Sequence, residues 1–211
     1  MKTFTFLFLL FFVSQVYGHS NFQRGFVITN EQDTLSGWID FRSDALNMSV
    51  CNFKTEYGGE ITTFLPGSIF GYRFYDIGRF YVSREIEIRG APRTVFLEFV
   101  LQGMMNLFYY VDISSEFGKV EFYFFEDENG RMVPITRRID DEGNRFRARE
   151  DLRNRRVIEY LFDEQETILQ QAGNLRFNRR SMINIAREYH DLTCPIGEEC
   201  VYQCWCFILS T

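Results

Sequence analysis

The chain has 211 residues, 45% of them apolar and 18% aromatic, and its formal net charge at pH 7 is −6. This length accommodates one domain, or one domain with an appendage. The negative charge argues against broad electrostatic binding to nucleic acid, and the aromatic content favours β-strands.

Residues 1–18, MKTFTFLFLLFFVSQVYG, have the pattern of a secretory signal peptide. Lys2 provides the basic start, an apolar run extends from Phe4 to Val13, and Val16 and Gly18 are the small residues before the expected cleavage site. The run is shorter than the about 20 residues that a membrane-spanning helix needs. We therefore expect an exported chain, periplasmic or outer-membrane-associated, with no transmembrane span after cleavage and an oxidising environment.

Residues 19–135 are predicted to form an antiparallel β domain, because short strand-like segments alternate with turn signals. The expected turns are Asn30-Glu31-Gln32-Asp33, residues 55–59, Pro66-Gly67, Asp76-Ile77-Gly78, Gly103-Met104-Met105 and Asn129-Gly130. The last of these is the strongest hairpin signal in the chain. Short connections favour antiparallel pairing, so the first part of the fold is expected to be a meander of about ten short strands.

Residues 136–193 are predicted to be a charged linker followed by two helices that pack on the sheet. The segment 137–149 mixes both charges with little apolar content, which indicates a linker or a solvated surface. Apolar residues at helical spacing predict one helix from about Glu150 to Ala172, with Gly173 as its C-cap. A second helix is expected to begin after Asn178, a good N-cap. Its buried stripe would be Met182, Ile185, Ala186 and Tyr189. The predicted fold class is α+β, mainly β, with two C-terminal helices.

Familiar catalytic motifs are absent from the sequence, which has no phosphate-binding glycine loop, no G-x-S-x-G and no H-E-x-x-H. Of the two histidines, His19 would be the new N-terminus and His190 ends the second predicted helix. The adjacent acids Asp140-Asp141 and Glu198-Glu199 lie in polar segments and indicate solvated surface. We therefore expect no enzymatic activity and no catalytic, cofactor-binding or metal-ligating residues.

The tail, residues 194–211, contains four of the five cysteines: Cys194, Cys200, Cys204 and Cys206. One interpretation is a metal site that combines the first three of them with His190. Zinc sites usually carry C-x2–4-C pairs, whereas the intervals between these four ligands are three, five and three residues. Another interpretation is a nucleophilic Cys194 activated by His190.

A disulfide between Cys194 and Cys200 fits an exported chain best. The loop between them contains Pro195 and Gly197, which allow the chain to turn back. Cys51 is expected to lie outside this loop. Cys204 and Cys206 are expected to lie in a frayed tail.

Three stretches of the chain resemble an uncharacterised family of exported proteins from bacteria of the Bacteroidetes kind. They are FVITNEQDTLSGWIDFR, then TVFLEFVLQGMMNLFYYVD with EFYFFEDENGRMVPI, and FNRRSMINIAREYHDLTCPIGEECVYQ. The resemblance covers about Gly25 to Tyr202, with Cys194, Cys200 and Tyr202 at matching positions. In many members this region is an N-terminal periplasmic module that precedes an outer-membrane β-barrel. Where those members continue into the barrel, this chain reads QCWCFILST.

The resemblance implies no activity, so it transfers no catalytic residues. The expected function is a non-enzymatic exported envelope module that binds an envelope protein or glycan. The alternative is a small exported enzyme with an unrecognised active site. A surface cluster of aromatic side chains would favour the binding module, whereas a deep pocket with perturbed carboxylates or His190 would favour the enzyme.

Overall fold

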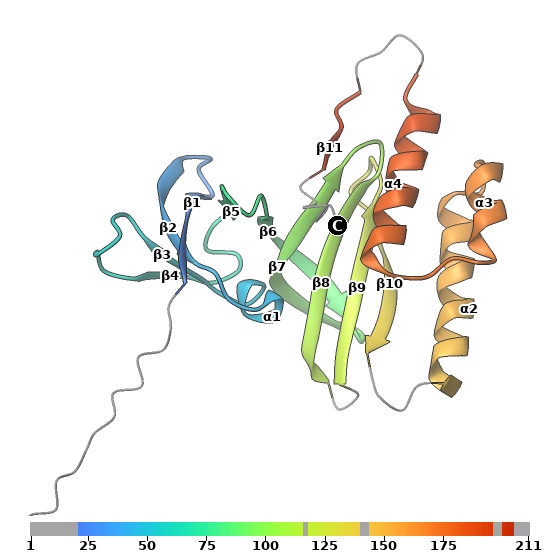
Figure 1. Cartoon of the computed structure of the whole chain (residues 1–211), viewed down its shortest axis with the longest axis horizontal. Helices are drawn as coiled ribbons and strands as arrows, with labels where there is room; N and C mark the ends of the chain where they lie inside the picture. Colours follow the sequence, from blue (N-terminus) through green and yellow to red (C-terminus); the bar gives the residue numbers. More distant parts are fainter. Residues whose placement is uncertain (1–20, 116–117, 140–143, 196–199, 205–211) are drawn as a thin grey trace, which may run out of the picture.

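The computed structural model describes residues 21–115, 118–139, 144–195 and 200–204, and only the backbone of residues 114, 115, 144–147 and 204. The predicted signal peptide, residues 1–18, lies outside this range. Ten antiparallel strands build the body of the molecule, and helices follow towards the C-terminus, which confirms the predicted fold class (Figure 1).

The strands follow the predicted segments closely. They are β1 (Phe22–Ile28), β2 (Thr34–Asp40), β3 (Cys51–Lys54), β4 (Thr62–Phe64), β5 (Gly71–Phe74), β6 (Phe80–Ile88), β7 (Ala91–Gln102), β8 (Asn106–Ser115), β9 (Gly118–Glu126) and β10 (Met132–Ile139), with a short β11 (Gln203–Cys204). The helices are α1 (Asp44–Asn47), α2 (Asn144–Leu161), α3 (Glu166–Ala172) and α4 (Arg179–Thr193).

The strand order is β10-β9-β8-β7-β6-β5-β1-β2-β3-β4. Because β5 pairs with β1 and not with β4, the sheet consists of two meanders, β1–β4 and β5–β10, joined through β1 and β5. Gly25 and Gly37 face each other across β1 and β2. A Cβ atom at Gly25 would collide with the carbonyl oxygen of Arg73, and one at Gly37 with that of Lys54. Glycine at both positions therefore permits the close strand approach that curls the first meander.

The helix α1 fills the point where β7 and β8 diverge. These two strands pair from Glu98–Tyr109 to Leu101–Leu107, with a register shift between. Beyond that pairing, the N–H of Phe96 donates to the carbonyl oxygen of Met48 at 3.0 Å. The N–H of Val111 donates to the Met48 sulfur at 3.2 Å. The buried Met48 thus satisfies one backbone donor from each separated strand.

Helices α2, α3 and α4 lie beside β7–β10, on the side away from the first meander (Figure 1). The single helix predicted from Glu150 to Ala172 is wrong, because α2 ends at Leu161 and α3 begins at Glu166. In an uninterrupted helix, Ile168 would lie about 120° around the axis from Phe162. The break allows both side chains to be buried.

Of the two interpretations of residues 137–149, the linker is wrong at both ends, whereas a solvated surface agrees with the exposure of Ile139, Ala148 and Arg149. β10 continues to Ile139 and α2 begins at Asn144, so the polar residues there belong to regular elements. The N-cap predicted at Asn178 is confirmed, since its side chain accepts a hydrogen bond from the N–H of Ser181 at 3.0 Å. Gly173 is the C-cap residue of α3, with a right-handed φ of −61°.

The hairpin predicted at Asn129-Gly130 is confirmed and has a three-residue loop. The N–H of Gly130 donates to the carbonyl oxygen of Asp127 at 3.0 Å, and that of Asp127 donates to Arg131 at 3.1 Å. Gly130 has a φ of +76°. This is the geometry of a type I turn followed by a glycine bulge, and it requires a residue that tolerates the left-handed region.

Candidate functional site

The outward surface of β1–β3 and the adjacent β5 is rich in aromatic and basic side chains. On β1, Gly25 and Val27 are buried, so the alternate residues Phe22, Arg24 and Phe26 point outward. Cross-strand pairing adds further residues from β2, β3 and β5 to the same surface. We call this surface the aromatic face and define it as Phe22, Arg24, Phe26, Ser36, Trp38, Lys54, Tyr57, Arg73 and Tyr75.

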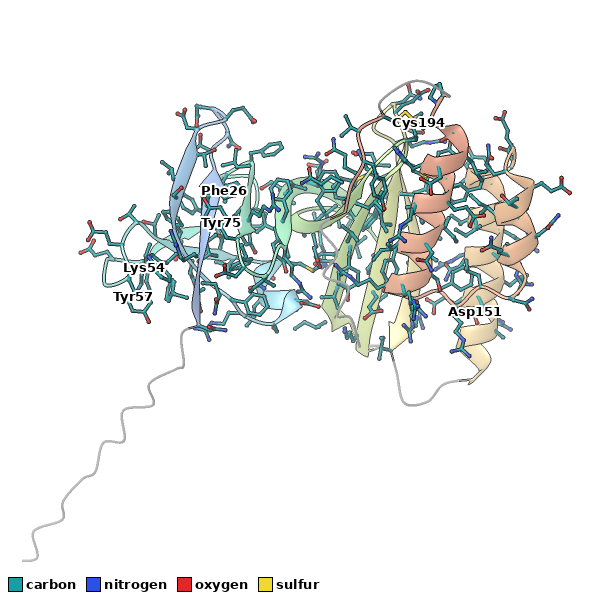
Figure 2. The ribbon with its side chains drawn as sticks, turned by 45° about the horizontal axis from the view of Figure 1, so that its top comes forward. Phe26, Lys54, Tyr57, Tyr75, Asp151 and Cys194 are labelled. Carbon is teal, nitrogen blue, oxygen red and sulfur yellow. A yellow bond between two sulfur atoms is a disulfide. The ribbon has the colours of Figure 1, made fainter. Side chains whose placement is uncertain are left out.

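The rings of the aromatic face contact one another while remaining accessible. Phe26 and Tyr75 have ring centroids 5.4 Å apart. Trp38 and Tyr57 meet edge to face at 4.8 Å. Tyr57 is 68% exposed and Tyr75 is 49% exposed. Figure 2 shows Phe26, Tyr75, Lys54 and Tyr57 on the part of the molecule away from α2, α3 and α4.

An open groove of about 480 Å³ lies within the aromatic face. Its lining residues are Arg24, Ser36, Gly37, Trp38, Thr55 and Tyr75. The hydroxyl groups of Ser36 and Tyr75 are 3.4 Å apart. Flat rings therefore lie next to hydroxyl and guanidinium groups, and the volume falls within the ~300–1,000 Å³ that is common for small-molecule sites.

A row of cross-strand partners anchors the aromatic face to the second meander. The row is Ser36, Phe26, Arg73, Phe80, Phe99, Phe108 and Phe124. Phe80 and Phe99 have ring centroids 6.1 Å apart, and Phe99 stacks on Phe108 at 4.5 Å. Such same-face pairs stabilise adjacent strands. The row therefore connects the aromatic face to the strands of the second meander.

A second feature, the charged seam, joins α1, β7, α4 and the turn before β6 around one buried carboxylate. It consists of Asp44, Arg79, Glu98 and Arg179. Arg179 donates through one guanidinium nitrogen to Glu98 Oε2 at 3.0 Å and through another to Oε1. Arg79 Nε lies 3.7 Å from Glu98 and its terminal nitrogen donates to Asp44. Because Glu98 is fully buried, its charge needs a cationic partner, and with Asp44 the two arginines make the cluster neutral as a whole.

A neighbouring buried carboxylate, Glu121, is also fully engaged. The hydroxyls of Tyr109 and Tyr123 donate to its two oxygens at 3.1 and 3.3 Å. Lys119 and Arg137 lie 3.2 and 3.8 Å away. Burial, followed by the charge of Glu121, raises the pKa of both phenols. The phenols therefore remain protonated donors, and Glu121 has a structural environment.

A cavity of about 340 Å³ lies between β10, α2 and the start of α4. It is lined by Arg137, Glu150, Asp151, Leu175, Arg176, Phe177 and Asn178. Both charge signs are present, and neither Glu98 nor Glu121 is among its lining residues. Figure 2 places Asp151 at this end of α2, far from the aromatic face.

The residues considered for the tail, Cys194, Cys200 and His190, make structural contacts. Cys194 and Cys200 form the predicted disulfide, with their Cα atoms 6.0 Å apart. Buried His190 accepts a hydrogen bond from the N–H of Met104 at 3.2 Å, and its ring lies 4.9 Å from that of Tyr202. These contacts give His190 a structural role. That role differs from both alternatives, a metal ligand and an activating partner of Cys194.

Of the expectations for the remaining cysteines, one is confirmed and one is wrong. Cys51 lies outside the disulfide loop, as expected, and it is buried and unpaired. Burial raises the pKa of its thiol, which disfavours a reactive thiolate. The frayed tail predicted for Cys204 is wrong, because β11 pairs its backbone with Leu101. The pairing of β6 with β7 ends at Phe99, which leaves that edge of β7 open. Cys206 lies outside the described residues.

Within the described ranges, no three His, Cys, Asp or Glu side chains are grouped to hold a metal ion. In the same part of the chain, no helix has the length and apolar character required to cross a bilayer. Searches against protein-family models, curated proteins and solved structures found no match for the chain.

Proposed function

We propose that the chain is a non-enzymatic exported envelope module that binds a glycan on its aromatic face. The observation that carries this proposal is the exposure of contacting aromatic rings beside polar donors. Tyr57 and Tyr75 are 68% and 49% exposed, and the groove next to them contains Arg24 and Ser36. Exposed apolar surface of this kind commonly marks an interaction site.

The chemistry of the face fits a sugar ring. A pyranose has apolar C–H faces, which pack on aromatic rings, and hydroxyl edges, which bond to donors and acceptors. Trp38 and Tyr75 supply rings with polar tips, while Ser36 and Arg24 supply hydrogen-bonding groups in the same groove. The alternation of rings with polar groups matches the two kinds of surface of a pyranose, and it is the reason for choosing a glycan.

The interior carboxylates support a binding role over catalysis. Glu98 is held by Arg79 and Arg179, and Glu121 by two phenols. A general acid or base must reach the substrate proton. Carboxylates bound in this way within the core serve the packing of the strands and helices.

The proposal is tested with protein purified from cells that express the full chain. Affinity electrophoresis through gels containing a panel of neutral and acidic polysaccharides should reveal retardation by at least one of them. The double variant Trp38→Ala/Tyr75→Ala should bind about tenfold more weakly, which corresponds to about 1.4 kcal/mol. Tyr160→Ala is the matched control, because Tyr160 is 61% exposed but lies on α2.

Retardation by none of the polysaccharides, or equal retardation of parent and double variant, would contradict glycan binding by this face. Capture of a defined envelope protein that the double variant loses would assign the face to a protein partner instead. Cell fractionation tests export separately. Recovery in the periplasmic extract is expected, whereas recovery only from the cytosol with Met1 retained would refute the signal peptide.

A further inference from the structure

We infer that the ligand of the aromatic face is an acidic glycan, one that bears carboxylate or sulfate groups. This inference rests on the proposed function and specifies its substrate class. It starts from the charge of the face. Three outward positions carry cations, namely Arg24, Lys54 and Arg73.

The outward strand positions of this surface carry almost no acidic side chains. Among the described residues of β1 to β5, the one acidic side chain at an outward strand position is Asp40. It is buried, and Arg42 Nε donates to it at 2.7 Å. At its strand positions the face therefore carries cations and no exposed carboxylate, on a chain whose net charge is −6. Such a local group of cations attracts anionic ligands to one surface.

The three cations are not neutralised within the protein. In the part of the chain that the structure describes, none of them forms an ion pair, whereas the interior Arg79 and Arg179 both pair with Glu98. The Nε of Arg73 is buried and has no hydrogen-bond partner.

Cations and rings alternate across the surface. Arg73 is the cross-strand neighbour of Phe26, and Arg24 lines the groove with Trp38 and Tyr75. A guanidinium presents paired donors that match a carboxylate or sulfate. An acidic polysaccharide offers the same alternation, with an apolar ring face and a charged substituent on each acidic sugar.

Lys54 adds a second type of contact. Its ammonium lies 4.3 Å from the centroid of the Phe22 ring, which holds the charge at the surface by a cation–π interaction. The ammonium faces the ring with one side and retains donors on the other. The cation is thus fixed next to an aromatic ring where a sugar can stack.

The test compares an acidic polysaccharide with its neutral ester, which has the same sugar chain. Binding of polygalacturonate and of its methyl ester is measured by isothermal calorimetry at 50 and 150 mM salt, with dextran sulfate as the sulfated probe and poly-glutamate as a polyanion without sugars. The acidic polysaccharide should bind at least tenfold more tightly than its ester. Arg24→Gln/Lys54→Gln should remove this preference. Arg149→Gln/Arg156→Gln, on α2, removes the same charge away from the face and should preserve it.

The possible binding results separate the inference from the proposed function. Stronger binding of dextran sulfate than of polygalacturonate would support the inference and select sulfate as the anion. Equal binding of the ester would overturn the inference and leave the proposed function intact. Equal binding of poly-glutamate would overturn it by showing that charge alone suffices. If neither these probes nor neutral glycans bind, the proposed function itself fails.

Discussion

The side-chain amide of Asn154 on α2 forms two hydrogen bonds with the backbone of Thr136 on β10, in the place where a neighbouring strand would pair. Its Nδ2 donates to the Thr136 carbonyl oxygen at 2.7 Å, and its Oδ1 accepts from the Thr136 N–H at 3.3 Å. Two residues further on, the carboxylate of Glu150 accepts from the N–H of Arg138 at 3.0 Å. Pro134, two residues earlier, has no N–H to satisfy. The edge of the sheet is therefore closed by side chains, which protects it from pairing with other chains.

Replacing Asn154 with leucine should destabilise the protein by about 1–3 kcal/mol, because it leaves a donor and an acceptor of Thr136 without partners. Urea unfolding followed by circular dichroism measures the change. Arg156→Leu is the control on an exposed position of the same helix. Equal free energies of unfolding for the two variants would show that the side-chain amide does not stabilise the edge.

Glu98→Gln should destabilise the protein by about 2–3 kcal/mol, since it leaves the guanidinium of Arg179 without its anion and leaves Arg79 paired with Asp44 alone. The value is below the ~3–5 kcal/mol of fully buried pairs, because these arginine side chains are 25% and 32% exposed. Adding Arg179→Met should recover part of the loss. Glu87→Gln, at an exposed position of β6, should change little. A loss no greater than that of Glu87→Gln would contradict a stabilising role for the charged seam.

Gly130→Val should lower stability by about 1–2 kcal/mol, the cost of placing a side chain in the left-handed region. The matched control is Gly58→Val, at a loop glycine without a positive φ and with open space around its Cβ direction. Thermal unfolding measures both. If both variants shift the melting temperature equally, the turn conformation at Gly130 is not the cause.

Stability should decline above pH of about 10. Burial raises the pKa of the buried tyrosines above their ordinary value; these are Tyr72, Tyr81, Tyr109 and Tyr123. In this window the unfolded chain loses phenolic protons that the folded chain keeps, so the tyrosine contribution is complete at lower pH and shrinks as pH rises. The slope is about 1.4 kcal/mol per pH unit for each such group.

Burial also raises the pKa of the Cys51 thiol. Because a thiol in the unfolded chain ionises at a lower pH than a phenol, Cys51 begins to reduce the stability before the tyrosines do. Guanidinium unfolding at pH 8 to 11 measures the sum, and Tyr109→Phe should have a shallower slope than the parent. An identical slope in that variant would show that Tyr109 ionises as readily in the folded state as in the unfolded state.

The sequence predicted most strands because their signals are local. The turn at Asn129-Gly130 and the apolar periods next to it depend on neighbouring residues only. The pairing of β5 with β1 depends on a contact between distant segments, so the order of the two meanders could not be read from the pattern. The broken helix was missed because Phe162 and Ile168 each fit helical spacing with other residues, although not with one another.

The candidate site was only partly predictable. High aromatic content was visible, but the gathering of Phe26, Trp38 and Tyr75 on one surface depends on strand register. Glu98 within the apolar stretch TVFLEFVLQ is a signal that could have been used, because a carboxylate in a buried strand requires a compensating cation. Its partners, Arg79 and Arg179, come from segments that only the fold brings together.

The central claim, that the aromatic face binds an acidic glycan, is tested most directly by NMR at Trp38. The chain has two tryptophans, Trp38 and Trp205, so the Trp38→Phe variant identifies the indole N–H signal of the residue on the face. Titration with tri-galacturonate should shift that signal, together with amides of β1 and β2, in a saturable manner. Shifts confined to the cavity near Arg137, or no shift at any concentration, would contradict the account.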